Sequence, residues 1–142
     1  MSQLEERFQT GLLEIDAEHA MLLDLTEQAR KLFEDENMLF KCADIRKILG
    51  GLQNYTVEHF THEERYMEDI GFPGLEEQKA QHREFAAKLA EFTERVSQLS
   101  IGTQDAMIYD LFQYLLKWLH DHIKKEDMKY VDFGNGKIKE NH

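Results

Sequence analysis

The apolar residues of this chain recur every three or four positions, in four long stretches separated by three short breaks. That spacing is the period of an α-helix, whereas a half-buried strand would alternate every second residue. The sequence therefore predicts helices at roughly 17–35, 41–69, 75–99 and 104–130. Because the connections between them are short, neighbouring helices are expected to run antiparallel. The expected fold is all-α, an up-down-up-down four-helix bundle.

The breaks carry residues that end or begin helices. Pro73 is the single proline and lies between two glycines in GFPG, where its fixed φ and missing N–H stop a helix. A second break is expected at SIGT, where Thr103 would cap the following helix. A third break is expected near DENM at 35–38.

Other glycines weaken the helical pattern in two places. Gly50 and Gly51 fall inside the second expected helix, where each costs about 1 kcal/mol relative to alanine. They predict either a bend or a close contact between helices. The tail after Tyr130 contains FGNGK, and we expect it to be irregular.

Length and composition limit the class of protein. A chain of 142 residues is expected to form one domain over 1–142, with 42% apolar and 32% charged residues. The net charge of −11 argues against nucleic acid as a partner, because neutralising phosphates requires a basic patch. No apolar run approaches the roughly 20 residues that span a membrane, and the start of the chain lacks a signal-peptide pattern. With Cys42 the only cysteine, an internal disulfide is excluded and a cytoplasmic protein is the simplest expectation.

Each expected helix also places a metal-ligand type of residue in line with its apolar residues. His19, His59, His82 and His122 occupy such core-facing positions on four different helices, and Glu63 follows His59 by one helical turn. A buried imidazole or carboxylate is costly unless it is paired or bound to a metal. A satisfied core histidine explains any one of them, but four converging histidines and a glutamate favour a metal site inside the bundle. Imidazole and carboxylate ligands without thiolate suit iron, manganese, zinc or copper.

The remaining histidines do not fit this pattern. His62, His120 and His142 lie off the apolar stripes or in the tail, and we expect them to be solvated. Asp127 follows His122 by five residues, which in an ideal α-helix turns it about 140° away. From spacing alone Asp127 would be a solvated acid.

Taken together, these motifs resemble the hemerythrin family of non-haem di-iron proteins, and bacterial members in particular, over nearly the whole chain. TGLLEIDAEHAMLLDL looks like the first family signature and makes His19 a ligand. HFTHE is similar to the second signature and supplies His59 and Glu63. WLHDHIKKEDMKY looks like the fourth and supplies His122 and Asp127. The resemblance implies two iron ions joined by an oxo or hydroxo bridge. Glu63 and Asp127 would also bridge the two ions, and His19 and His59 would bind one of them.

The third family signature is where this sequence departs from the pattern. The family has two histidines four apart after a turn, whereas FPGLEEQKAQHREF supplies His82 at the second place and Gln78 at the first. The other iron, which is not held by His19 and His59, would then keep only His82 and His122 as imidazole ligands. Either the Gln78 carbonyl ligates the metal, or water fills the position, or the metal there is weakly held.

The resemblance implies a protein that binds O2 reversibly, as an oxygen carrier, store or sensor. Its ligands would be O2 or small anions. Family members protect bound oxygen inside an apolar pocket, and five apolar residues stand where that lining is expected. They are Leu22, Phe60, Trp118, Leu119 and Ile123.

Three other functions remain open from the sequence. A di-iron peroxidase or oxidase is one, because Gln78 would leave an open position on the iron that His82 and His122 hold. A sensor whose output depends on a protein partner is the second, and no feature of the sequence identifies such a partner. A metal-free helical bundle is the third.

Overall fold

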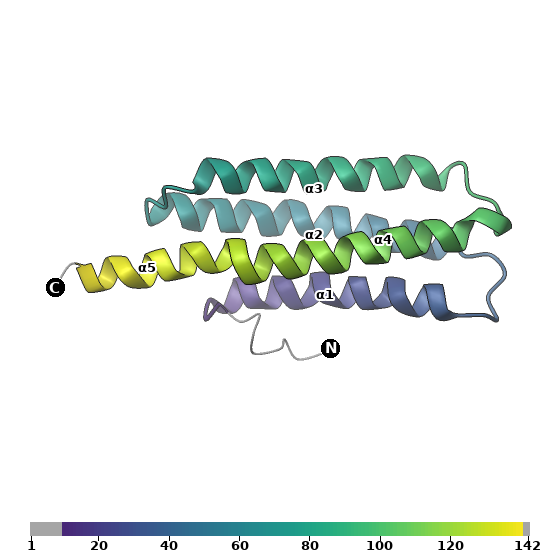
Figure 1. Cartoon of the computed structure of the whole chain (residues 1–142), viewed down its shortest axis with the longest axis horizontal. Coiled ribbons are helices and arrows are strands. Elements are labelled where there is room, and N and C mark those ends of the chain that lie inside the picture. Colours follow the sequence, from purple (N-terminus) through teal and green to yellow (C-terminus); the bar gives the residue numbers. More distant parts are fainter. Residues whose placement is uncertain (1–9, 141–142) are drawn as a thin grey trace.

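The chain folds into helices that pack against one another through the apolar stripes of the sequence. The computed structural model describes residues 10–140, and Figure 1 shows the helices lying side by side along one long axis. The elements are α1 (Leu13–Glu34), α2 (Cys42–Asp69), α3 (Leu75–Val96), α4 (Ile101–Asp121), the π-helical turn η2 (His122–Asp127) and α5 (Met128–Glu140). No strand is present among these residues. The predicted all-α four-helix bundle is therefore confirmed.

The breaks fall where the sequence predicts them, although two helices begin earlier than expected. α1 starts at Leu13 because the Asp16 carboxylate accepts hydrogen bonds from the Thr10 backbone N–H and hydroxyl, both at 2.7 Å. α4 starts at Ile101 and not at 104, and the backbone N–H of Ser100 donates to Thr103 Oγ1 at 3.0 Å. Ser100 is therefore the cap residue, and Thr103 supports it from inside the first turn.

The prediction of an irregular tail after Tyr130 was wrong, because α5 continues as a helix to Glu140 and extends beyond the other helices (Figure 1). Packing outweighs the weak helix propensity of its glycines. Tyr130 and Val131 are buried in an apolar cluster with Ile15 and Met67. A side chain at Gly134 would lie only 3.1 Å from the Tyr66 hydroxyl, so a glycine lets the helices approach closely there.

The two glycines inside α2 differ in their surroundings. A Cβ added at Gly51 would lie 3.2 Å from Leu25 Cδ2 on α1, whereas one at Gly50 would meet nothing within 4 Å. The predicted close helix contact is therefore present at Gly51. Gly71 has a φ of +68°, a conformation that glycine adopts without strain, and it turns the chain from α2 toward α3.

The buried apolar residues form two clusters rather than one. The larger cluster fills one part of the bundle and includes Leu22, Phe60 and Ile123, while the smaller one includes Ile15 and Tyr130. Along α1, His19 falls between the residue of the smaller cluster and the residue of the larger one. The polar residues singled out in the sequence therefore form a layer between two apolar regions. We call it the ligand layer, and it consists of His19, His59, Glu63, Gln78, His82, His122 and Asp127.

None of the described helices is both long and apolar enough to cross a membrane.

Candidate metal centre

The ligand layer is built from α1, α2, α3 and the π-helical turn η2, which turn polar side chains inward among apolar neighbours. α1 supplies His19, α2 supplies His59 and Glu63, and α3 supplies His82. Each of these side chains is buried, and so are those of Gln78, His122 and Asp127. The structure thus brings the residues predicted from the sequence into one site.

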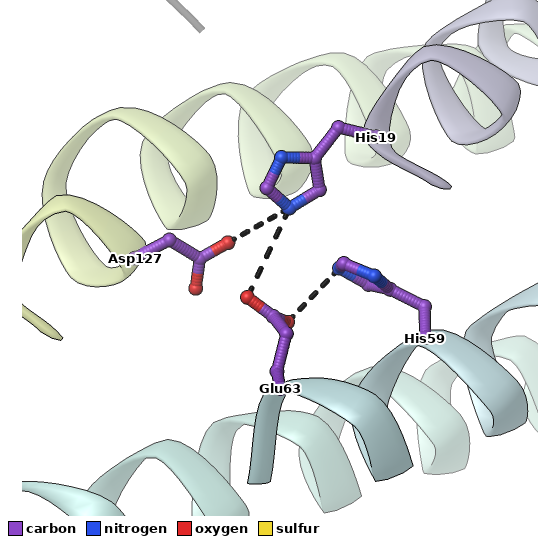
Figure 2. Close-up of side chains that lie close together, drawn as sticks. All are labelled: His19, His59, Glu63 and Asp127. Carbon is purple, nitrogen blue, oxygen red and sulfur yellow. Dashed lines mark ion pairs between the residues drawn. The ribbon is translucent and has the colours of Figure 1, made fainter. Parts of the chain in front are cut away.

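The first group of ligand-type side chains comprises His19, His59, Glu63 and Asp127 (Figure 2). His59 Nε2 lies 2.9 Å from Glu63 Oε1, and His19 Nε2 lies 3.1 Å from Asp127 Oδ2. One atom from each side chain lies within 4.8 Å of all the others, which is close enough to surround a single ion.

The second group shares Glu63 with the first and adds His82 and His122. The two imidazoles face each other, with their Nε2 atoms 3.2 Å apart. Glu63 Oε1 lies 3.5 Å from His82 Nε2, and Asp127 Oδ1 lies 3.0 Å from His122 Nε2. Two adjacent ion-sized groups therefore share carboxylates, which is the arrangement of a paired metal site.

Asp127 reaches the site because the helix is locally unwound. Residues His122–Asp127 form a π-helical turn, in which hydrogen bonds join residues five apart instead of four. That wider turn places Asp127 on nearly the same face as His122, whereas an ideal α-helix would point it away. The spacing argument that made Asp127 a solvated acid was therefore wrong, and Asp127 is fully buried.

The hydrogen bonding of the ligand layer is incomplete in a way that fits a bound cation. Several fully buried polar atoms have no hydrogen-bond partner among the described residues: both ring nitrogens of His19, Glu63 Oε1, Gln78 Oε1 and both Asp127 carboxylate oxygens. A buried polar atom without a partner costs about 1–3 kcal/mol, and more when it is charged. The unpartnered atoms are imidazole nitrogens and oxygens, the donors that iron accepts.

Side chains outside the ligand layer orient the histidines. Glu18 Oε1 lies 2.9 Å from His59 Nδ1, and Glu64 Oε2 lies 2.7 Å from His82 Nδ1. Gln81 Oε1 lies 2.9 Å from His122 Nδ1. An acceptor on Nδ1 fixes the proton there and leaves Nε2 free to face a metal.

These orienting residues were missed by the sequence reasoning. Glu18, Glu64 and Gln81 each stand next to a residue of the ligand layer in the sequence, and each bonds to a histidine on another helix. The sequence did contain one signal for them, because each is a carboxylate or amide directly next to a candidate ligand. Which histidine each one serves depends on the packing of the helices.

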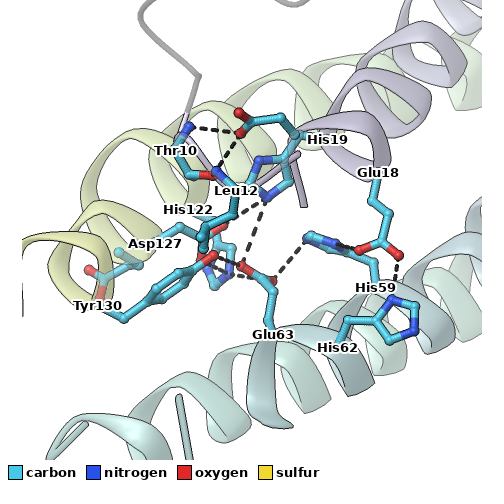
Figure 3. Close-up of polar contacts among 12 residues, drawn as sticks. Thr10, Leu12, Glu18, His19, His59, His62, Glu63, His122, Asp127 and Tyr130 are labelled. Atoms are coloured by element: carbon cyan, nitrogen blue, oxygen red, sulfur yellow. Dashed lines mark hydrogen bonds and ion pairs between the residues drawn. The ribbon is translucent and has the colours of Figure 1, made fainter. Parts of the chain in front are cut away.

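Tyr130 was also missed, although it stands at the end of the fourth expected helix. Its hydroxyl donates to Glu63 Oε2 at 2.7 Å, so the phenol holds the shared carboxylate from the smaller apolar cluster (Figure 3). Burial raises the pKa of the Tyr130 phenol, and the Glu63 and Asp127 carboxylates raise it further. Tyr130 therefore remains a proton donor to Glu63.

Gln78 has one end fixed and the other unpartnered. Its Nε2 donates to the backbone carbonyl of Glu126 at 2.8 Å, within the π-helical turn. Its Oε1 is buried with no hydrogen-bond partner. The amide thus ties α3 to η2 and leaves a carbonyl oxygen available as a ligand.

The carboxylates dominate the electrostatics of the layer in the absence of metal. Burial alone would lower the pKa of His59, but Glu63 and Glu18 outweigh it and raise that pKa to about 10. Burial likewise opposes the raised pKa of His19, which Asp127 and Glu63 cause. The pKa of Glu63 is lowered well below its usual value, because the neighbouring histidines overcome the effect of burial. Protons on His19 and His59 therefore occupy the place of cationic charge that a metal would take.

The apolar residues proposed from the sequence lie beside the histidines. The Phe60 ring stacks on His82 with centroids 3.9 Å apart, and the Trp118 ring stacks on His122 at 4.4 Å. Leu22, Leu119 and Ile123 are buried in the same larger cluster. That these five residues line an oxygen pocket stays a prediction.

The other histidines have different surroundings from those expected. His62 is only 28% exposed, and its Nδ1 lies 2.5 Å from Glu18 Oε2 and 3.2 Å from Glu14 Oε1. It therefore shares a hydrogen bond with a carboxylate and is not simply solvated. His120 is partly exposed next to Asp121, and His142 lies outside the described residues.

Comparison with known proteins agrees with the geometry. The family model described as Hemerythrin HHE cation binding domain matches residues 10–133. The chain is 28% identical to bacteriohemerythrin of Clostridium acetobutylicum over 128 residues, covering 90% of this chain and 97% of that protein. It is 31% identical to myohemerythrin of Riftia pachyptila over 129 residues, covering 89% and 88% of the two chains.

A helical bundle whose helices converge on two His/carboxylate groups with a shared glutamate defines a metal-binding bundle protein. Since the family model covers most of the sequence, the chain belongs to the hemerythrin family, whose members are non-haem iron proteins that bind oxygen at a di-iron centre.

Proposed function

We propose that this protein binds O2 reversibly at two iron ions held by the ligand layer, and that it serves as an oxygen carrier, store or sensor. His19 and His59 would hold one iron, and Gln78, His82 and His122 the other. Glu63 and Asp127 would bridge them. Its relatives support the proposal by their names, bacteriohemerythrin and myohemerythrin.

The observation that carries the proposal is the position of Asp127. One of its oxygens lies 3.1 Å from His19 Nε2, and the other lies 3.0 Å from His122 Nε2. A single carboxylate therefore faces a histidine of each group, with both oxygens lacking a hydrogen-bond partner. A bridging ligand requires that geometry, whereas an ordinary buried ion pair does not.

The other residues around the centre would orient the ligands and exclude water. When bound, the iron pair supplies the electrons and the open coordination position that O2 needs. Glu18, Glu64 and Gln81 orient the imidazoles, while Tyr130 keeps its proton and holds Glu63 in place. Leu22, Phe60, Trp118, Leu119 and Ile123 exclude water from the site, which disfavours the loss of oxygen as a charged species.

We propose that Gln78 contributes its Oε1 to the second iron. The hydrogen bond from Nε2 to the Glu126 carbonyl fixes the orientation of the amide, and Oε1 is buried without another partner. A neutral amide oxygen is a weaker ligand for iron than an imidazole. The second iron should therefore be held less firmly than in a site with a third histidine.

The decisive experiment is a visible absorption spectrum of the iron-loaded, reduced protein before and after exposure to O2. A new band that appears with O2 and disappears when O2 is removed under argon supports reversible binding. Two iron ions per chain are expected by elemental analysis. A protein that is oxidised irreversibly by O2, with no intermediate band, contradicts the proposal.

A second candidate function is a di-iron peroxidase or oxidase, and one observation favours it. A surface groove of about 580 Å³ between α3 and α4 is lined by Gln81, Trp118, His122 and Glu126, among others. It brings solvent next to the half of the site where Gln78 replaces a histidine. Sustained consumption of peroxide by the iron-loaded protein, with a reductant present, would favour this enzyme over the oxygen carrier.

A further inference from the structure

A second group of ligand-type side chains lies outside the buried centre, on the seam between α1 and α2. Glu14 and Glu18 stand one turn apart on α1, and His62 faces them from α2. His62 Nδ1 lies 2.5 Å from Glu18 Oε2 and 3.2 Å from Glu14 Oε1. One atom from each of the three residues lies within 4.8 Å of the others.

The arrangement differs from a simple patch of acids, because an imidazole nitrogen from another helix stands between the two carboxylates. A proton on Nδ1 can point at only one of them, so the second carboxylate faces the ring without a hydrogen of its own. Glu14 and Glu18 also repel each other at this spacing. A divalent cation would bind all three groups at once and remove that repulsion.

A cation can reach this group from the solvent. Glu14 is 71% exposed, whereas Glu18 and His62 are only 20% and 28% exposed, so a cation would be partly shielded from water once bound. Ligand atoms at about 2.0–2.2 Å from a tetrahedral ion lie roughly 3.4 Å apart. The Glu14–His62 separation already approaches that value, and Glu18 needs only a small outward movement.

Glu18 connects this group with the buried centre, as Figure 3 shows. Its Oε2 faces His62, while its Oε1 lies 2.9 Å from His59 Nδ1. The same carboxylate therefore serves the surface group and orients a histidine of the ligand layer. A cation on Oε2 would draw charge away from Oε1 and weaken the hydrogen bond that His59 donates.

We propose that Glu14, Glu18 and His62 form an accessory site for a divalent transition-metal ion of the Zn²⁺ class, and that its occupancy adjusts the buried iron pair through Glu18 and His59. The donor set of one imidazole and two carboxylates suits Zn²⁺. Water would complete its coordination on the exposed side. The binding itself does not depend on the proposed function, whereas the coupling to iron rests on it.

The test is a calorimetric titration of the oxidised, iron-loaded protein with Zn²⁺, after EDTA treatment and buffer exchange. One equivalent of Zn²⁺ is expected to bind to the wild type. His62→Ala and Glu14→Gln should each weaken that binding at least about 10-fold, since even changes outside a metal's direct ligands cost 10–100-fold. Glu14 is highly exposed, so its variant is expected to fold normally. His120→Ala removes a histidine of similar exposure from α4 and should bind Zn²⁺ like the wild type.

Failure to bind Zn²⁺, or equal binding by wild type and His62→Ala, overturns the site. Iron content is measured after the titration. If Zn²⁺ only replaces iron, to the same extent in wild type and His62→Ala, the accessory site is also overturned. Zn²⁺ binding should also shift the visible band of the iron pair in wild type but not in His62→Ala; a bound Zn²⁺ without that shift overturns the coupling. If the chain held no iron pair, the difference between wild type and His62→Ala would still be measurable on the metal-free protein.

Discussion

The larger apolar cluster and the ligand layer beside it share α1, α2 and α3, yet different forces hold them together. In the cluster, residues such as Ile45, Leu52 and Phe85 are completely buried against apolar neighbours. In the ligand layer, His19, Glu63 and Asp127 are just as deeply buried but retain polar atoms without a hydrogen-bond partner, which contact one another only as histidine–carboxylate pairs. The apolar cluster is complete as a protein core, whereas the ligand layer is complete only with a cation.

This difference means that folding and metal binding are separable along the bundle. Burial of apolar side chains stabilises the cluster whether or not a metal is present. The ligand layer costs stability in the metal-free chain and recovers it when iron binds, because metal binding contributes directly to folding free energy. Variants in the two regions should therefore separate iron content from stability.

The largest effect is expected for Glu63→Ala, which removes the carboxylate that both ligand groups share. Iron binding should weaken by several kcal/mol, since even changes outside the direct ligands cost 10–100-fold in affinity. His62→Ala, one position away, should retain its two iron ions per chain. Elemental analysis of the purified variants checks this pair, and equal iron loss from both would refute the inward assignment of Glu63.

Above neutral pH, the pH dependence of stability should come from the histidines of the ligand layer. In the metal-free protein the pKa of His59 is raised to about 10 by Glu63 and Glu18 against the effect of burial. A raised pKa in the folded state gives stability that is complete below the unfolded value of about 6.5 and is lost as the pH rises toward 10. Between pH 6.5 and 9 we expect the metal-free protein to lose on the order of 3 kcal/mol.

Denaturant unfolding at several pH values measures this loss. The iron-loaded protein is the control, because metal takes the place of the protons and its stability should not fall over that range. A metal-free protein with flat stability from pH 6.5 to 9 would show that His59 carries no extra proton.

Tyr130→Phe keeps the ring in the smaller apolar cluster but removes its hydroxyl. Glu63 Oε2 would then lose its 2.7 Å hydrogen bond, and a buried acceptor left without a donor costs about 1–3 kcal/mol. Faster iron loss to a chelator is the expected result. Tyr66→Phe is the matched control on α2, and its iron should be lost at the wild-type rate.

Gln78→His would give the second iron a third imidazole in place of an amide oxygen. The oxygenated spectrum should then persist about 10-fold longer, the effect of roughly 1.4 kcal/mol in binding. The lifetime is compared at equal iron content. If the wild type already holds oxygen as long as the variant, Gln78 is a competent ligand and the enzyme alternative loses its main support.

The smallest effects belong to the apolar part of α2. Gly50→Ala should stabilise the protein by about 0.5–1 kcal/mol, because its Cβ meets nothing and alanine favours a helix. Gly51→Ala should gain less or lose stability, since its Cβ would lie 3.2 Å from Leu25 Cδ2. Thermal melts give the comparison. Iron content should be unchanged in both, and a loss of iron would show that the two regions are not separable.

The sequence predicts the apolar part of the bundle well because helix period and packing agree there. It also predicts that His19, His59, Glu63 and His82 face inward, since each follows the same period as its apolar neighbours, and all four are buried. Helix ends were less accurate, and the part of α5 after Tyr130 was missed because its glycines favour irregular structure, which tertiary packing overrides.

The contacts between helices could not be predicted from the sequence. The bonds from Glu18, Glu64 and Gln81 to histidines depend on which faces meet, and one-dimensional spacing does not contain that information. Asp127 is the clearest case. Its inward position needs a backbone irregularity that the α-helical period excludes, so only the resemblance to relatives indicated it.

The π-helical turn has a consequence for how this segment can vary. It acts as a phase shift of the helix: every residue after it is rotated relative to a continuous α-helix. Tyr130 follows Asp127 by three positions and so shares its face, which means one shift delivers both a carboxylate and the phenol that steadies the other carboxylate. Lys124 and Lys125 are exposed, so substitutions of these side chains should leave the site intact. The length of the turn, in contrast, cannot change, because removing one residue would rotate both Asp127 and Tyr130 out of the site.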